Sequence, residues 1–462
     1  MDQNAAHSPA SMTGTEIRSA AALASVFFLR MLGLFMILPV LPLHADALDG
    51  ATPMLIGLAL GGYGVSQALL QIPFGMLSDR WGRKRVITFG MLLFAAGGVV
   101  AGLSESIYGV ILGRVLQGAG AVAAAVMALA ADLTTEVHRT KAFAMIGSSI
   151  GLAFLLAFVF GPLIYSHHGL PAVFWAAAAS GLAAIAILHA VVPDPPRSPH
   201  HRDCEADAGE LARILGNGPL MRLNVGVFSL HFVLTASFVV LPLALRDQVG
   251  LDPGHHWALY LPVLIASVVL MIPFLWLAER RHQLKPVMVG GIALITLTEI
   301  AFAERAGGLA GIAALLVAFF TAFNLLEALL PSLVSRTAPL GAKGTALGVF
   351  STAQFLGSFA GGALGGYLHG AVNDSMVHLA AAAVAAIWLI ASATMPGQAM
   401  LRQQVIPIGA LSPGAAAALR TRLVAIVGVA DAVVVADEGV AYLLVDPERL
   451  DAVALRTATA VA

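Results

Sequence analysis

The sequence predicts an all-α integral membrane protein: twelve transmembrane helices in two bundles of six, followed by a small α+β domain. Three observations support this prediction. Of the 462 residues, 59% are hydrophobic and only 11% are charged, whereas a soluble domain carries about 25% charged residues. Long apolar stretches recur along the chain, and charged residues gather in the short segments between them. The last 65 residues lose this pattern and become more polar.

A helix needs about 20 mostly apolar residues to cross the hydrocarbon core of a membrane. Twelve stretches meet this requirement. The first six cover 18–43, 54–78, 86–104, 107–131, 141–166 and 170–192. The second six cover 219–245, 254–278, 286–303, 308–334, 344–369 and 375–396. They define one bundle over 18–192 and another over 219–397, preceded by a polar tail over 1–17.

Lysine and arginine are distributed unevenly between the two sides of these spans. Most loop cations fall on one side, among them Arg80, Arg83, Lys84, Arg139 and Lys343. Because such residues collect in cytoplasmic loops, both termini are predicted to be cytoplasmic, in the inner membrane of a bacterium.

Residues 193–218 form the longest break in hydrophobicity and are predicted to be a cytoplasmic linker between the bundles. The flanking halves resemble each other, because Leu70–Arg80 and Leu270–Arg280 share the pattern Leu-x-Ile-Pro-Phe and end in an acid followed by arginine. A duplicated six-helix unit places its substrate site at the interface of the repeats, near the bilayer midplane.

The tail, 398–462, is predicted to fold as a separate cytoplasmic domain. Strands are expected over 405–408, 433–435 and 441–445, and helices over 415–427 and 451–461. The order β-α-β-β-α is that of a ferredoxin-like domain. It contains neither cysteine nor histidine, so a metal-chaperone role is not expected.

Composition also excludes several kinds of partner. The 25 basic and 26 acidic residues nearly balance, and no nucleic-acid partner is predicted. The single cysteine, Cys204, excludes a disulfide framework or a site with two thiolate ligands. No metal, cofactor or enzymatic activity is predicted, because no nucleophile, metal or phosphate-loop constellation is present.

The strongest local motif connects the second and third spans. Gly75 and Gly82 permit a tight turn, and Asp79 beside basic residues can form an ionic network that closes one face of the bundles. The basic residues are Arg80, Arg83, Lys84 and Arg85. This segment resembles signature motif A of the major facilitator superfamily, and Arg114–Ala121 resembles motif B of its drug–proton antiporters. The segments 29–33, 139–142, 323–332 and 343–346 resemble a twelve-span member with a C-terminal ferredoxin-like domain.

The resemblance implies a role for motif A in closing the cytoplasmic side of the outward-facing state. Asp79 is then expected against the start of span eleven, near 341–345, with Arg83 linking it to Asp132. Motif C is incomplete, since Gly161 and Pro162 are present but Ala157 replaces an expected glycine. That substitution leaves the direction of transport open.

Ionisable groups at membrane depth are costly and usually functional. The candidates for proton coupling or cavity lining are Arg30, Arg114, Gln117, His231 and Glu327. Glu327 is the first candidate proton carrier because it is the most deeply placed acid, whereas Glu299 is expected to reach the outer interface. Gly361 and Gly362 in span eleven, like Gly161 and Pro162, are expected to allow close helix packing.

The predicted function is proton-coupled secondary transport by alternating access of the two bundles, with export of small amphipathic compounds. The expected partners are a small-molecule substrate, protons and the lipid bilayer, and the protein is expected to be a monomer. Two alternatives stay open. One is proton-coupled uptake of a small metabolite, and the other is a non-transporting sensor that signals through its C-terminal domain.

Overall fold

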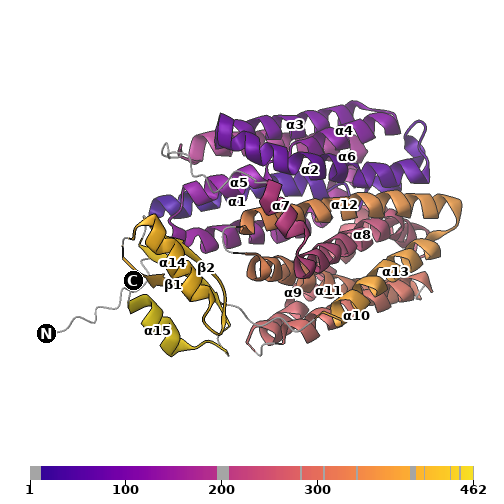
Figure 1. Ribbon diagram of the computed structural model, residues 1–462. Coiled ribbons are helices and arrows are strands. Elements are labelled where there is room, and N and C mark those ends of the chain that lie inside the picture. The colour runs from indigo at the N-terminus through magenta and orange to yellow at the C-terminus, as the bar shows by residue number, and fades with distance from the viewer. Residues whose placement is uncertain are drawn as a thin grey trace.

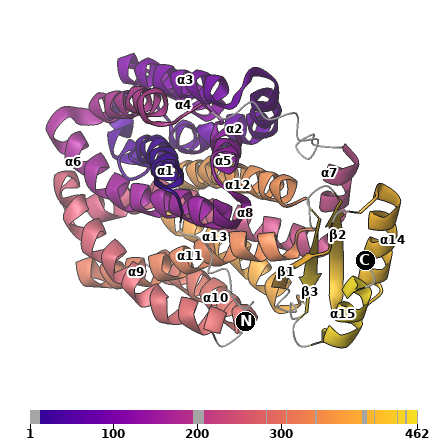
Figure 2. The same ribbon diagram turned by 90° about the vertical axis from the view of Figure 1, so that its left-hand side faces the viewer.

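The computed structural model describes residues 12–194, 208–280, 283–304, 307–339, 342–395, 402–409, 411–436, 439–446 and 449–460. Its helices form two bundles, with a small sheet domain beyond the helix ends (Figure 1). Figure 2 looks along the helices and shows α1–α5 on one side and α9–α13 on the other. The predicted all-α membrane architecture with a C-terminal α+β domain is confirmed.

The first bundle contains all the helices before the linker. They are α1 (Gly14–Phe35), α2 (Pro53–Trp81), α3 (Arg83–Leu103), α4 (Ile107–Ala119), α5 (Ala123–Asp132) and α6 (Glu136–Val191). α4 and α5 together make one crossing, interrupted at 120–122. The first span is shorter than predicted, because α1 ends at Phe35 and the chain continues as turns and the 3-10 helix Leu41–Ala47.

Helix α6 accounts for the difference between twelve predicted spans and the eleven spanning helices among the described residues. Its 56 residues would extend about 84 Å as a straight helix, far more than the bilayer core of about 30 Å. Gly169 breaks it with a φ of 74°, a left-handed conformation that glycine adopts without steric cost. The element therefore comprises the predicted spans five and six, joined at Gly169.

The second bundle follows the linker, in which α7 (Ala208–Leu215) is a short helix that the sequence did not predict. Residues 195–207 of the linker lie outside the described residues. The bundle comprises α8 (Gly218–Asp247), α9 (His256–Arg280), α10 (Leu284–Ala303), α11 (Gly308–Thr337), α12 (Lys343–Ala371) and α13 (Asp374–Ala393).

The C-terminal domain is built from β1 (Arg402–Pro407), α14 (Pro413–Val424), β2 (Val429–Val435), β3 (Val440–Val445) and α15 (Ala452–Ala460). The three strands form an antiparallel sheet in the order β1-β3-β2. Buried Leu419, Leu423, Leu443 and Leu455 join the helices to the sheet in a core of its own.

Two helix ends serve as reference points below. The motif A end is the end of the bundles at which α2 finishes and α12 begins, and the opposite end is where α2 begins and α12 finishes. The bundles meet closely toward the opposite end. There, a Cβ added to Gly57 of α2 would lie 2.1 Å from the carbonyl oxygen of Gly362, and one added to Gly366 would lie 2.4 Å from that of Pro53.

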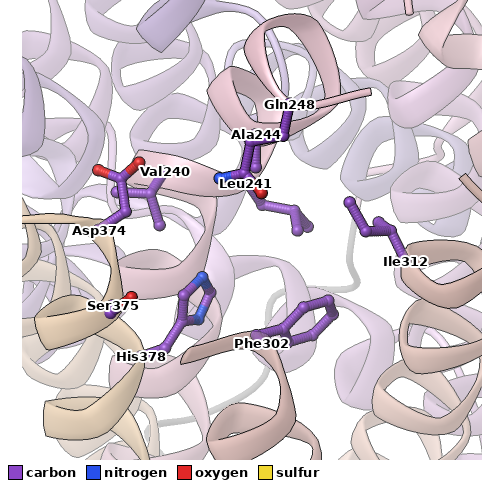
Figure 3. A pocket seen from close by; sticks show the side chains of 9 residues that line it. All are labelled: Val240, Leu241, Ala244, Gln248, Phe302, Ile312, Asp374, Ser375 and His378. Atoms are coloured by element: carbon purple, nitrogen blue, oxygen red, sulfur yellow. The ribbon is translucent and has the colours of Figure 1, made fainter. Parts of the chain in front are cut away.

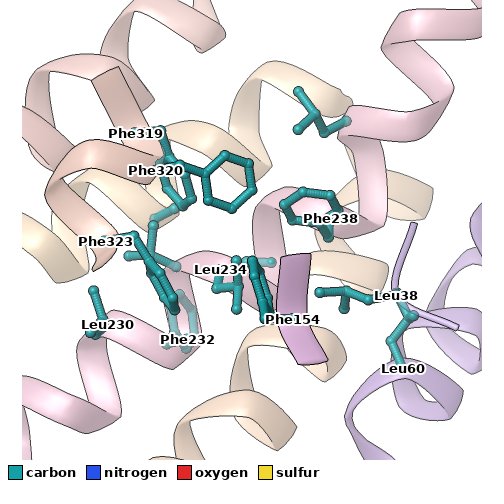
Figure 4. Packing of buried hydrophobic residues seen from close by; sticks show 14 of the residues in the cluster. Leu38, Leu60, Phe154, Leu230, Phe232, Leu234, Phe238, Phe319, Phe320 and Phe323 are labelled. Atoms are coloured by element: carbon teal, nitrogen blue, oxygen red, sulfur yellow. The ribbon is translucent and has the colours of Figure 1, made fainter. Parts of the chain in front are cut away.

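Aromatic side chains extend this contact through the middle of the molecule (Figure 4). Phe154 of α6 lies 5.9 Å from Phe320 and 6.0 Å from Phe323 of α11, between ring centroids. Phe158, one turn further along α6, contacts Phe238 of α8 at 5.0 Å and Tyr260 of α9 at 5.3 Å. Such ring pairs stabilise beyond the area they bury, so the opposite half of the seam is firmly packed.

The motif A half of the same helices is more open. Gly344 and Gly348 of α12, and Gly147 and Gly151 of α6, have no atom within 4 Å of an added Cβ, apart from their own helix turns and chain neighbours. The contrast with Gly57 and Gly362 indicates that the two bundles are closed at the opposite end in this structure.

We predict that Gly57→Ala prevents this closure, because its Cβ would overlap backbone atoms of α12 that cannot rotate away. Spin labels at the exposed Leu103 and Val372, in a Cys204→Ser background, report the separation of the bundles at the opposite end. The Gly57→Ala distance distribution should shift to longer distances. Gly62→Ala is the matched control, since its Cβ would lie 3.9 Å from Val115; equal distributions in both variants would refute the prediction.

Candidate functional site: buried charges in the two bundles

The motif A residues form an ionic cluster at the end of α2. Arg83, which opens α3, pairs with Asp79 and donates from Nε to Asp132 Oδ2 at 3.1 Å. Its Nη1 also donates to the hydroxyl of Ser78 at 2.8 Å. Gly82 has a φ of 94°, so a residue without a Cβ permits the turn that brings Arg83 back over α2. Arg83 thus joins the ends of α2 and α5.

The remaining motif residues lie around this cluster. Lys84 pairs with Asp194 at 2.9 Å, and this contact lowers the pKa of the exposed Asp194 carboxyl. Arg80 is exposed, and a Cβ added to Gly75 would make ordinary contact with Ala124 of α5. The expected contact of Asp79 with the start of α12 falls partly on 340–341, which lie outside the described residues.

Arg30 is completely buried in the first bundle. Its Nη2 donates to Gln67 Oε1 of α2 at 2.8 Å, and its Nε donates to the carbonyl oxygen of Gly120 at 3.2 Å. It lies five residues before the end of α1, so it is further from mid-helix than predicted. Neutral acceptors hold this charge in place of a carboxylate.

Arg114 of α4 is satisfied in the same way. It donates to the carbonyl oxygens of Ala59 and Leu60 at 3.1 and 3.3 Å, and to Gln117 Oε1 at 2.8 Å. The guanidinium carbon also lies 4.7 Å from the centroid of the Tyr63 ring, a cation–π contact. Arg114 and Gln117 were both predicted as site residues, and the structure places them in direct contact.

The second bundle holds the acid. Glu327 of α11 accepts a hydrogen bond from Gln354 Nε2 of α12 at Oε1, over 3.4 Å. The same amide nitrogen lies 2.8 Å from His231 Nε2 of α8. His231 Nε2 lies 3.7 Å from Glu327 Oε2. Two residues predicted separately, His231 and Glu327, therefore belong to one cluster, which Gln354 completes.

One oxygen of this cluster lacks a partner. Glu327 Oε2 is buried and makes no hydrogen bond in the structure, although the side chain as a whole is 34% exposed. His231 Nδ1 faces the carbonyl oxygen of Val227 at 3.2 Å, which fixes a hydrogen on Nδ1 and leaves Nε2 as an acceptor. A proton on Oε2 would thus point toward an acceptor 3.7 Å away.

The expectation for Glu299 was wrong. Its side chain is fully buried in α10 and accepts from Ser237 Oγ at 2.8 Å. His378 Nδ1 of α13 lies 2.8 Å from its other oxygen. Hydropathy indicates how deep a residue lies but not which way it faces, so the sequence favoured the interface over the bundle interior.

Sequence reasoning also missed Glu16, in the first turn of α1. Its carboxylate accepts from the backbone nitrogens of Thr13 and Thr135, each at 2.8 Å, and lies 3.1 Å from His138 Nδ1. It therefore serves the N-termini of α1 and α6 together. A glutamate three residues after a threonine is the signal of a capping box, and the sequence contains it.

The predicted packing residues make close contacts with backbone. A Cβ on Gly161 would lie 2.4 Å from the carbonyl oxygen of Met36, and one on Gly361 would lie 2.2 Å from that of Phe232. Gly362 faces Gly57 across the seam. Pro162 lies inside α6, next to Gly161.

The chain matches the model of the Major Facilitator Superfamily over residues 23–362. It belongs to that superfamily and is a multi-pass membrane transporter. Among its relatives, "Inner membrane transport protein YajR" of Escherichia coli is 44% identical over 94% of this chain and 95% of its own length. "Multidrug resistance protein MdtH" of Aeromonas salmonicida is 26% identical over 74% of this chain and 85% of its own length.

Solved structures show the same fold. A bacterial homologue of the human lysosomal transporter Spinster, in an inward-facing and unoccupied conformation, aligns with a TM-score of 0.67 at 16% identity, over 83% of this chain and 98% of that one. A D-xylose–proton symporter aligns with a TM-score of 0.63 at 17% identity, over 83% of this chain and 98% of that one. The predicted superfamily and fold are confirmed by these matches.

We predict that Gln67→Leu destabilises the protein by about 1.5–3 kcal/mol, the value of a hydrogen bond to a charged group, because Arg30 would lose its side-chain acceptor. Unfolding in detergent micelles with increasing denaturant measures this change. Gln71→Leu on the same helix is the control, since Gln71 Oε1 is buried without a partner and its loss should cost less. Equal destabilisation by the two substitutions would contradict this assignment.

Proposed function

We propose that this protein is a proton-coupled exporter of small amphipathic compounds, in which the cluster of Glu327, His231 and Gln354 binds the transported proton. The observation that carries the proposal is the unpartnered Glu327 Oε2, 3.7 Å from His231 Nε2. A carboxylate oxygen held away from water without a hydrogen bond is costly. One proton removes that cost and supplies the missing donor between the two groups.

The position of the cluster supports a link between protonation and movement. Its three members come from α11, α8 and α12, and α12 also forms the seam with α2. When Glu327 is ionised, it depends on Gln354 of α12 for its hydrogen bond; when it is protonated, it can donate to His231. A change of protonation thus alters what holds α12, the helix that contacts the other bundle.

The first bundle complements this cluster with fixed positive charge. Arg30 and Arg114 keep their protons under all physiological conditions, and amide and carbonyl oxygens hold both. We infer that they orient substrate and set the electrostatic potential of the interface, while the carboxyl group of the second bundle changes its charge.

Direction and orientation follow from the same set of observations. The motif A end carries most loop lysines and arginines, so we place it and both termini in the cytoplasm, in the inner membrane. The seam is closed at the opposite end, which corresponds to a state open toward the cytoplasm. Motif B and the relative named as a multidrug resistance protein support export. The motif A cluster of Asp79, Arg83 and Asp132 would then stabilise the outward-facing state.

Compounds retained by cells test this function before a substrate is identified. Cells that produce the wild-type protein, Glu327→Gln or no protein are compared by untargeted chemical profiling of their contents. We expect compounds depleted only by the wild type, and these should leave wild-type proteoliposomes only when a pH gradient is imposed. Glu327→Gln should abolish the response to the gradient, because an amide cannot exchange the proton.

Glu304→Gln is the matched control, since Glu304 is an exposed acid at the end of α10. Accumulation of a compound by wild-type cells under the same gradient would instead establish uptake by symport. Unchanged gradient dependence in Glu327→Gln would remove Glu327 from its role. Absence of any flux, together with an intact signalling output of the C-terminal domain, would favour a sensor.

A further inference from the structure

A second polar cluster is buried in the second bundle, away from Glu327. Glu299 of α10 is 0% exposed, His378 of α13 is 4% exposed and Ser237 of α8 is 2% exposed. Ser237 Oγ donates to Glu299 Oε1 at 2.8 Å, and His378 Nδ1 lies 2.8 Å from Glu299 Oε2. Three helices thus converge on one carboxyl group that the proposed transport mechanism does not use.

A small pocket reaches this cluster from the opposite end of the bundle (Figure 3). Its walls come from the ends of α8, α10, α11 and α13, and His378 is the member of the cluster that lines it. Figure 3 shows the imidazole directed into the pocket beside Phe302, with Asp374 and Ser375 on the same wall. The stacking of Phe302 on His378, at 5.2 Å between centroids, holds the ring in this orientation.

The chemistry of the pair is that of a proton relay. Ser237 commits its hydroxyl hydrogen to Oε1, so the acceptor that remains is Oε2, which faces His378 Nδ1. A water in the pocket can place a proton on the other ring nitrogen, Nε2, while the Nδ1 proton moves to Glu299 Oε2. The site gains one proton, its net charge changes from −1 to zero, and the imidazole ends with its hydrogen on Nε2.

No fixed cation among the described residues neutralises this carboxylate. At this end of the bundle, α8 contributes Arg246 and Asp247, which pair with each other at 2.6 Å. Asp374 of α13 pairs with His369 of α12 at 2.5 Å. α10 ends at the exposed Glu304, and α11 lines the pocket with Ile312. A buried negative charge without a cationic partner favours uptake of a proton.

We propose that Glu299, His378 and Ser237 form a second proton-binding site, which exchanges its proton with the medium at the opposite end of the molecule. Ser237 and His231 lie on α8 six residues apart, about 9 Å along the helix axis. Protonation of Glu299 therefore acts on the helix that holds His231, and it makes the transporter responsive to pH on that side of the membrane. The site does not depend on the role proposed for Glu327.

Infrared difference spectroscopy of the full-length protein in lipid nanodiscs tests the site, with the pH raised from mildly acidic to mildly alkaline. The wild type should show a protonated-carboxyl band that disappears as the pH rises. The band should be absent in Glu299→Gln and present in both Glu327→Gln and Glu304→Gln. A band identical in wild type and Glu299→Gln, or a Glu299 band that does not respond to pH, would overturn the proposal.

Two further measurements separate a proton site from a structural contact. Ser237→Ala removes a donor to the carboxylate, so the Glu299 band should persist to higher pH; an unchanged midpoint would contradict the relay. In sealed vesicles of known orientation, the band should follow the pH at the opposite end. Dependence on the pH at the motif A end alone would refute the proposed access through the pocket. Ser237→Ala also serves if Glu299→Gln does not fold.

Discussion

The structure depends on one constraint, that every charged group at membrane depth must find its partner inside the protein. The two bundles meet it differently. The first surrounds Arg30 and Arg114 with amide and carbonyl oxygens, which stabilise a charge without being able to take its proton. The second pairs Glu327 and Glu299 with histidines, whose protons can move. Fixed charge and exchangeable charge are thus assigned to opposite sides of the interface.

The glycines of α12 give this division a mechanical consequence. One row, including Gly361, packs on the backbone of α8, and another, including Gly362, packs on α2 of the other bundle. Gln354 lies on the same helix and contacts both His231 and Glu327. A contiguous series of contacts therefore runs from the proposed proton site to the seam, and a rearrangement of the cluster has a direct path to the contact between the bundles.

Much of this could be predicted from sequence, because apolar length and loop charge are linear properties. The spans, the linker and the order of the C-terminal elements depend only on them, and the Arg83–Asp79–Asp132 contacts were implied by the motif A resemblance. The rotation of a helix about its axis is not a linear property. For this reason the sequence misplaced Glu299, and it gave no indication that Gln67 and Gln354 are the amides that satisfy Arg30 and Glu327.

The most direct test of the central claim is the pH dependence of the separation between the bundles. Spin labels at Ala190 and Arg280, both exposed at the motif A end, report this separation in a Cys204→Ser background. If protonation of Glu327 controls the conformation, the wild-type distance distribution will change with pH, and Glu327→Gln will keep the wild-type low-pH distribution at every pH. A Glu327→Gln protein whose distances still follow pH as the wild type does would contradict the account.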